Sequence, residues 1–267
     1  MKEYISSLYG RIPTIDDFAD GPVFDPDKSS KEEYADFCRL VASWENDLMA
    51  SISYNKDYKQ YGALLKSKTS STTSLRVGGD QMVTGWLPHL RAGKKKDYRD
   101  YLNRAIPEIE PALLAKFIEA KYTSGNIIFW KRHRESVNTE RGKAPILDRI
   151  DLTLESLKRW YAKESGGAQE SVELLPQFNE DRDYFIEIFG SFKSFVSCFK
   201  LEPFLTGESI IDLEYSNLDS EYGERNVLPV TEGRFSDKLP ENYERYLRNA
   251  IVLIEKRTKA LAPIFES

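Results

Sequence analysis

Side chains able to bind an anion follow the apolar run GNIIFW (125–130). The basic or potentially basic residues directly after this run are Lys131, Arg132, His133, Arg134, Arg141 and Lys143. The turn sequence SVNTERGK (136–143) adds Asn138 and Glu140 to Arg141. Arginine holds anionic oxygens as a two-pronged fork, asparagine orients a ligand by hydrogen bonds, and glutamate can take up a proton. We therefore expect Asn138 and Arg141 to bind a phosphate-bearing ligand, with Glu140 as a catalytic base or charge stabiliser.

A second group of charged residues opens the amphipathic segment APILDRIDLTLESLKRWY (144–161). Asp151 and Glu155 are four residues apart, so on a helix they are neighbours that repel unless a cation lies between them. Arg149, or the arginine of the preceding turn, could supply that cation in an Asp–Arg–Glu constellation. In one interpretation Arg149 clamps the ligand and Asp151 acts as a base or charge stabiliser. In the other, Asp148 and Glu155 belong to a structural brace, or the charges form only a solvated helix face.

The segment LRVGGDQM (75–82) contributes a further candidate, Asp80, which we expect to orient the ligand by hydrogen bonds. Gly78 and Gly79 could allow close approach to a phosphate, or could simply form a turn. A second basic stretch, LRAGKKKD (90–97), is either a solvated loop or part of a phosphate-binding patch.

Motifs that fix a reaction are missing from this sequence. His89 and His133 are far apart and neither lies in an HExxH frame, so we expect no metal site. The GxSxG, Walker A and GxGxxG patterns are also absent. The cofactor is therefore unknown, with NAD as one possibility.

Apolar periodicity predicts a mostly helical chain with a small sheet. Expected helices cover residues 31–52, 98–106, 111–123, Pro145 to about Ala162, 184–199 and 241–265. Expected strands lie around Gly78-Gly79, at 125–130 and at 209–216. Lys256, Arg257 and Lys259 near the end of the last helix suit its negative dipole end.

Length and composition favour a helix-dominated α+β protein with a small sheet. We expect a single globular domain over 31–265, preceded by an arm over residues 1–30 that is rich in Pro, Gly and Asp. The net charge of −5 gives no overall basic field, so nucleic-acid binding would need a local patch. An apolar run of the roughly 20 residues needed for a membrane span and a secretory leader are not seen. With Cys38 and Cys198 expected as buried free thiols, the protein is predicted to be cytoplasmic and not bound to membranes.

The stretch from IIFWKRHRE through SVNTERG to DRIDLTLESLKRWY resembles the signature of a widespread bacterial family of unknown function. The similarity continues through FIEIFGSFKSFV (185–196) and a final helix with a Y-x-x-x-R pattern. The resemblance covers roughly residues 30–260, and D-R-x-D-L-T-L-E is its most specific part. This chain departs from the family pattern at RVGGD, which keeps Asp80 but has Gly78 and Gly79 in place of two serines. It also departs after the apolar run, where Trp130-Lys131-Arg132 replaces F-P-G-N.

Two functions of different class follow from these patterns. The first is a bacterial enzyme acting on a nucleotide, NAD or nucleic acid, with a toxin or phage-defence effector of ADP-ribosyltransferase-like type as its most specific form. The second is a binding or interaction protein without catalysis, in which the Arg/Asp cluster is structural and the protein partner is unknown.

Overall fold

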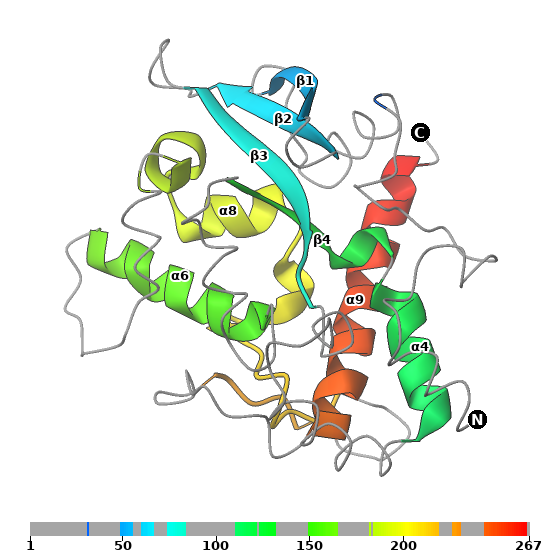
Figure 1. Ribbon diagram of the computed structural model, residues 1–267. Coiled ribbons are helices and arrows are strands. Elements are labelled where there is room, and N and C mark those ends of the chain that lie inside the picture. The colour runs from blue at the N-terminus through cyan, green and yellow to red at the C-terminus, as the bar shows by residue number, and fades with distance from the viewer. Residues whose placement is uncertain are drawn as a thin grey trace, which may run out of the picture.

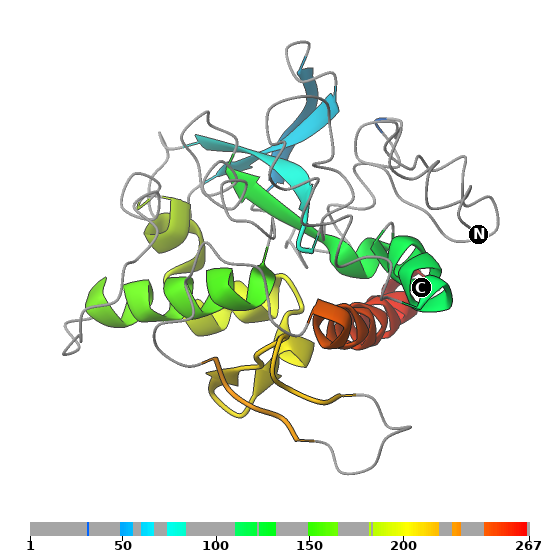
Figure 2. The same ribbon diagram turned by 60° about the horizontal axis from the view of Figure 1, so that its bottom comes forward.

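An antiparallel four-stranded sheet lies across one side of the molecule, and the main helices gather on the other side in the computed structural model (Figures 1 and 2). The structure describes residues 31, 49–55, 60–66, 74–83, 110–121, 123–131, 149–164, 182, 184–218, 226–230 and 243–265. Within these residues helix exceeds strand, which confirms the helix-dominated α+β class. The predicted arm at residues 1–30 and the predicted helix at 98–106 lie outside the described residues.

The sheet has the order β1-β2-β3-β4, with every neighbouring pair antiparallel. Its strands are β1 (Met49–Asn55), β2 (Gln60–Lys66), β3 (Ser74–Gln81) and β4 (Ile127–Lys131). The strand predicted at 125–130 is confirmed from Ile127 onward as β4, while Gly125 and Asn126 belong to a 3₁₀ turn. Gly78 and Gly79 lie within one continuous strand opposite Trp130 and Phe129, so the expected turn between two short strands is wrong.

The helix predicted for residues 31–52 is wrong at its end, because Met49–Asn55 is strand β1. Lys31 is helical, and residues 32–48 lie outside the described part of the chain. Ser51, Ile52, Ser53 and Tyr54 alternate between polar and apolar, which is the period of a strand. Pairing with β2 over this stretch decides the conformation.

Helix α4 (Pro111–Lys121) begins at the proline, as predicted, and packs along the long helix α9 (Tyr243–Phe265) (Figure 1). A short 3₁₀ turn, η4 (Ser124–Asn126), then leads into β4. A Cβ atom on Gly125 would lie 2.1 Å from Thr258 Oγ1 and 2.4 Å from the Ile254 carbonyl oxygen. Only glycine therefore allows η4 to lie so close to α9.

Helix α6 (Ile150–Glu164) buries one apolar face, formed as predicted by Ile150, Leu154, Leu157 and Tyr161. The predicted start at Pro145 is wrong, because Arg149 precedes the first helical residue.

The aromatic stretch 184–199 is two helices and not the single predicted one. A π-helical turn, η5 (Tyr184–Phe189), ends at Gly190, and α8 (Phe192–Cys198) follows. Next come a 3₁₀ turn, η6 (Glu202–Phe204), and a small hairpin of β5 (Leu205–Thr206) and β6 (Ser209–Ile210). The strand predicted at 209–216 is confirmed only at its start, since the chain turns after Ile211.

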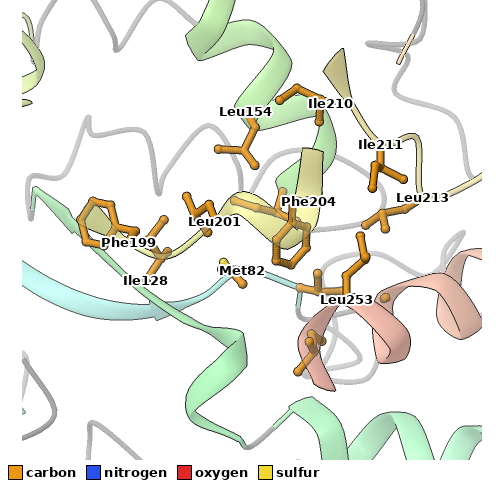
Figure 3. Packing of buried hydrophobic residues seen from close by; sticks show 14 of the residues in the cluster. Met82, Ile128, Leu154, Phe199, Leu201, Phe204, Ile210, Ile211, Leu213 and Leu253 are labelled. Atoms are coloured by element: carbon orange, nitrogen blue, oxygen red, sulfur yellow. The ribbon is translucent and has the colours of Figure 1, made fainter. Parts of the chain in front are cut away.

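The hydrophobic core lies between the sheet, α6, the 199–213 region and α9 (Figure 3). Met82 and Ile128 reach it from the sheet side, Leu154 from α6 and Leu253 from α9. Burial of such side chains contributes roughly 1.5–3 kcal/mol each, so this core holds the elements at fixed positions. None of the helices described by the structure is both long enough and apolar enough to cross a membrane.

Candidate functional site

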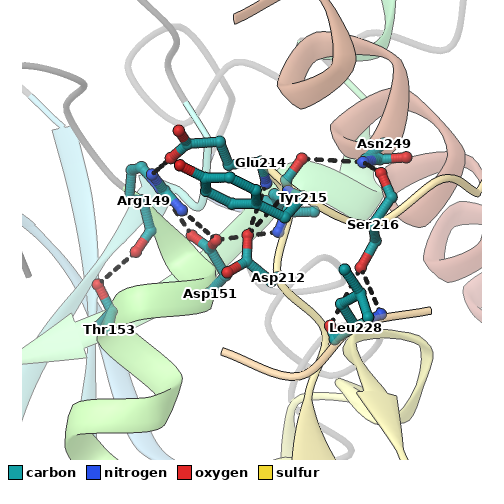
Figure 4. Close-up of polar contacts among 10 residues, drawn as sticks. Arg149, Asp151, Thr153, Asp212, Glu214, Tyr215, Ser216, Leu228 and Asn249 are labelled. Atoms are coloured by element: carbon teal, nitrogen blue, oxygen red, sulfur yellow. Dashed lines mark hydrogen bonds and ion pairs between the residues drawn. The ribbon is translucent and has the colours of Figure 1, made fainter. Parts of the chain in front are cut away.

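Arg149, Asp151 and Glu214 form a buried ion-pair cluster at the start of α6, here called the Arg149 cluster (Figure 4). Arg149 Nε donates to Asp151 Oδ1 at 3.0 Å, and Nη2 donates to Oδ2 at 2.5 Å. The remaining terminal nitrogen, Nη1, donates to Glu214 Oε2 at 3.1 Å. The exposed fractions are 8% for Arg149, 0% for Asp151 and 7% for Glu214, so water barely reaches the cluster.

The backbone at the start of α6 fixes two of these residues. The Arg149 carbonyl oxygen accepts from Thr153 N at 3.0 Å and from Thr153 Oγ1 at 2.9 Å. Arg149 therefore occupies the cap position, and Asp151 lies in the first turn, where a carboxylate is stabilised by the helix dipole. Asp151 Oδ2 also accepts from the backbone N–H of Leu213 at 3.1 Å. Both oxygens of the Asp151 carboxylate thus already accept hydrogen bonds from protein groups.

A tight turn at residues 212–218 supplies Glu214. Asp212 Oδ1 accepts from the backbone N–H groups of Glu214 at 2.9 Å and Tyr215 at 3.0 Å, which closes the turn. Ser216 Oγ donates to the Leu228 carbonyl oxygen at 3.1 Å and accepts from Leu228 N at 3.0 Å. These bonds explain why the expected strand ends here, because side chains take over the backbone partners that a strand would use.

Asn249 of α9 fastens the same turn to the long helix. Its Nδ2 donates to the carbonyl oxygens of Leu213 at 2.9 Å and Ser216 at 2.6 Å, and its Oδ1 accepts from Leu218 N at 3.0 Å. Asn249 is 1% exposed, so the amide is satisfied entirely by protein groups.

The Arg149 guanidinium also lies 5.3 Å from the ring centroid of Tyr246 on α9, within cation–π range. Burial acts to lower the pKa of Arg149, but the charge and hydrogen bonds of Asp151, followed by Tyr246 and Glu214, outweigh it. The net effect raises the pKa of Arg149 above its ordinary value, so the guanidinium is charged at every physiological pH.

The expected Asp–Arg–Glu constellation exists, but its glutamate is Glu214. Glu155 instead pairs with Arg159 one turn along α6, with Arg159 Nε 2.6 Å from Glu155 Oε1. In the observed geometry the Arg149 cluster joins α6, the 212–218 turn and α9, which is the arrangement of a brace.

Of the other predicted site residues, the structure places only the backbone of Asp80. Asn138, Glu140, Arg141 and Asp148 lie outside the described residues. Asp80 lies in β3 opposite Ile128, and only its backbone position is described. Their binding and catalytic roles stay predictions. Among the residues that the structure does describe, no group of three or more His, Cys, Asp or Glu side chains is arranged to hold a metal ion.

Sequence reasoning missed Asp212, Glu214 and Asn249. The strand expected at 209–216 includes Asp212 and Glu214, although two acidic residues within three positions are unfavourable in a strand and typical of turns closed by side chains. Asn249 lies next to the apolar face of α9 at Ala250, which was a usable signal that its amide is buried and bonded.

Arg257, which we expect to suit the negative dipole end of α9, is instead buried in the core. Arg257 is 0% exposed, and its guanidinium donates to three backbone carbonyl oxygens. Nε and Nη2 donate to the Phe199 oxygen at 2.9 and 2.7 Å. Nη1 donates to the Gly125 oxygen at 2.8 Å and to the Ile127 oxygen at 2.7 Å. Burial lowers the pKa of Arg257 to about 9, and the charge of Glu202 offsets part of that effect, so Arg257 is still a cation at neutral pH. It joins η4, β4 and the end of α8 to α9.

Comparison with known proteins identifies a family and no further relative. No curated protein and no solved structure matches the chain. The model of a family of unknown function, DUF6994, matches residues 14–261, which include the Arg149 cluster, Arg257 and most of the chain. The chain is a member of this family of unknown function.

Proposed function

We propose that this protein binds a phosphate-bearing ligand through residues 131–143 and acts on it as an enzyme. A nucleotide or NAD is the preferred ligand, and a nucleic-acid strand is the further candidate. The observation that carries the proposal is that this basic stretch lies between two buried anchors. Before it, Ile127–Phe129 of β4 are almost fully buried, and after it Arg149 is held by two carboxylates. Rigid elements that hold a polar connecting segment at both ends are a common construction for binding sites.

The charge of the segment supports an anionic ligand. Between Lys131 and Lys143 there are five Lys and Arg residues and two Glu residues, in a chain whose net charge is −5. A local excess of cations in an acidic protein attracts phosphate groups without a general affinity for polyanions.

The geometry of the Arg149 cluster separates bracing groups from candidate ligand groups. All three nitrogens of the Arg149 guanidinium already donate to carboxylates, and both oxygens of Asp151 accept hydrogen bonds while none of its side chain is exposed. We therefore assign Arg149 and Asp151 to the brace, in preference to the clamp and the catalytic base. Ligand binding then falls to Asn138 and Arg141, with Asp80 as a further candidate, and proton transfer falls to Glu140.

The first experiment measures NAD consumption and nucleotide binding by the purified protein. Arg141→Ala should abolish binding, because a guanidinium fork to phosphate is lost. Arg245→Ala is the matched control, since Arg245 is an exposed arginine on α9. ADP-ribosyl transfer, the most specific form of the proposal, requires NAD turnover that depends on Glu140. If the wild-type protein binds neither nucleotides nor a nucleic-acid strand and does not consume NAD, the proposal is wrong.

The second candidate function is a non-catalytic interaction protein, and the bracing geometry of the Arg149 cluster is the observation that favours it. Thermal melting of Arg141→Ala distinguishes the two. If Arg141 belongs to a buried ion-pair network, its loss costs about 3–5 kcal/mol and the variant melts several degrees lower. If Arg141 is a ligand clamp, the melting temperature holds while nucleotide binding disappears.

A further inference from the structure

The junction between η5 and α8 combines a π-helical turn with a glycine in the left-handed region. Gly190 N donates to the Phe185 carbonyl oxygen at 3.0 Å, which is the i to i+5 bond of a π-helical turn. Gly190 has a positive φ of 72°, and Ser191 is fully extended with a φ of −151° and a ψ of 158°. Residues 184–199 therefore consist of the π-helical turn η5, a break at Gly190 and Ser191, and the separate helix α8.

The apolar spacing of the same segment also fits an unbroken α-helix. Apolar residues recur at steps of three and four at Phe185, Ile188, Phe189, Phe192, Phe195, Val196 and Phe199. In the observed arrangement Phe192 is only partly buried, although the pattern places it in the centre of the stripe. Among the described residues, none hydrogen-bonds the buried Oε2 of Glu187. Both features raise the free energy of the observed arrangement.

Other contacts stabilise the observed break between η5 and α8. Tyr161 of α6 donates its hydroxyl to the Phe185 carbonyl oxygen at 2.8 Å, the same oxygen that accepts from Gly190. Ser191 Oγ accepts from Ser194 N at 3.1 Å and so caps α8. Glycine alone tolerates the left-handed backbone at position 190 without strain.

We propose that residues 184–199 can switch between two backbone arrangements, here called registers. One is the observed π-turn and break, which the Tyr161 hydroxyl and Gly190 favour, and the other is a continuous α-helix. The far end of the segment is fixed, because the Phe199 carbonyl oxygen accepts two hydrogen bonds from Arg257. A change of register is therefore taken up before Gly190, where it rotates Tyr184–Phe189 and moves Glu187 relative to α6.

The test follows the backbone of Ser191 by the NMR chemical shift of its Cα atom, which separates extended from helical conformation. Gly190→Ala disfavours the positive φ and favours helix, so Ser191 should become helical. Tyr161→Phe removes one buried hydrogen bond and should raise the ratio of continuous to broken register by roughly five- to tenfold. The double variant should be helical at Ser191 throughout its population.

Two matched controls accompany these variants. Gly207→Ala makes the same change at another positive-φ glycine, with φ of 61° and no neighbouring atom within 4 Å, and should leave the Ser191 signal extended. Tyr246→Phe removes a different buried hydroxyl group and should also leave it unchanged. If Ser191 stays extended in Gly190→Ala, Tyr161→Phe and the double variant, there is one register and the proposal is overturned. If Gly190→Ala does not fold, Tyr161→Phe decides alone by the same shift.

Discussion

Replacing Arg149 by alanine removes the cation from the Arg149 cluster and leaves two carboxylates buried without it. Asp151 is 0% exposed and Glu214 is 7% exposed, so neither can regain water without local unfolding. Breaking a buried ion pair by removal of one partner costs about 3–5 kcal/mol, most of it from the charge left behind. For a domain of this size we expect a fall in melting temperature on the order of 10 °C.

The measurement is urea or thermal unfolding of Arg149→Ala beside two comparison variants. Arg182→Ala removes an arginine whose side chain is 55% exposed and whose ion pair with Glu164 is at the surface, so it should cost less than about 1 kcal/mol. Arg149→Lys keeps the charge but cannot reproduce the two-pronged contact with Asp151, so its stability should lie between wild type and alanine.

A variant with neutral side chains at all three positions of the Arg149 cluster tests whether buried unpaired charge causes the loss of stability in Arg149→Ala. Arg149→Met combined with Asp151→Asn and Glu214→Gln removes every charge together, and should recover much of the stability lost in Arg149→Ala. If Arg149→Ala unfolds at the same urea concentration as Arg182→Ala, the cluster does not brace the fold and Arg149 returns as a candidate ligand clamp.

Three further outcomes follow from single residues. Gly125→Ala should cost about 3 kcal/mol or more in urea unfolding, because its Cβ would lie 2.4 Å from a backbone oxygen of α9. Gly207→Ala meets no atom within 4 Å, so it should cost less, about 1–2 kcal/mol of backbone strain. Burial raises the pKa of Tyr161, so the folded state keeps the hydroxyl proton while the unfolded chain loses it above about pH 10. Below that pH the contribution of Tyr161 to the free energy of unfolding is fully present, and above it the free energy of unfolding falls by up to about 1.4 kcal/mol per pH unit. Alkaline unfolding of Tyr161→Phe should lack this slope, and an unchanged slope contradicts the assignment. Arg257→Met should cost at least about 3 kcal/mol, since it leaves buried carbonyl oxygens without a donor, and an unfolding midpoint equal to wild type would show that those oxygens find other partners.

The spacing of apolar residues is sufficient to predict a helix or strand where that spacing continues without interruption. The period of Ile150, Leu154, Leu157 and Tyr161 predicts α6 because every member packs against the same core. The region around Met49–Asn55 was misassigned because its pairing partner, β2, decides between helix and strand, and apolar residues at short spacing fit either. The break at Gly190 was missed for a related reason, since the aromatic stripe continues across it.

In the Arg149 cluster, closeness in the sequence does not identify the ion-pair partner. From the sequence, Glu155 is the obvious partner for the charges that open α6, because it lies four residues from Asp151. In the structure the glutamate of the cluster is Glu214, 65 residues beyond Arg149. Nothing in a helix-face argument points to a partner in another turn, because that pairing depends on how α6, the turn and α9 pack together.

Arg257 shows that the sequence nevertheless contained a signal for buried charge. On α9 the buried stripe runs through Ala250, Ile254 and Leu261, and Arg257 falls in phase with it, three residues after Ile254 and four before Leu261. A cation that serves the helix dipole should lie on the solvated face, as Lys256 does. A charged residue in phase with an apolar stripe must instead find partners in the core, because an unpaired buried charge is too costly to persist. The phase of a charged residue, and not its distance from a helix end, therefore decides whether it should be interpreted as a surface cation or as a joint between elements.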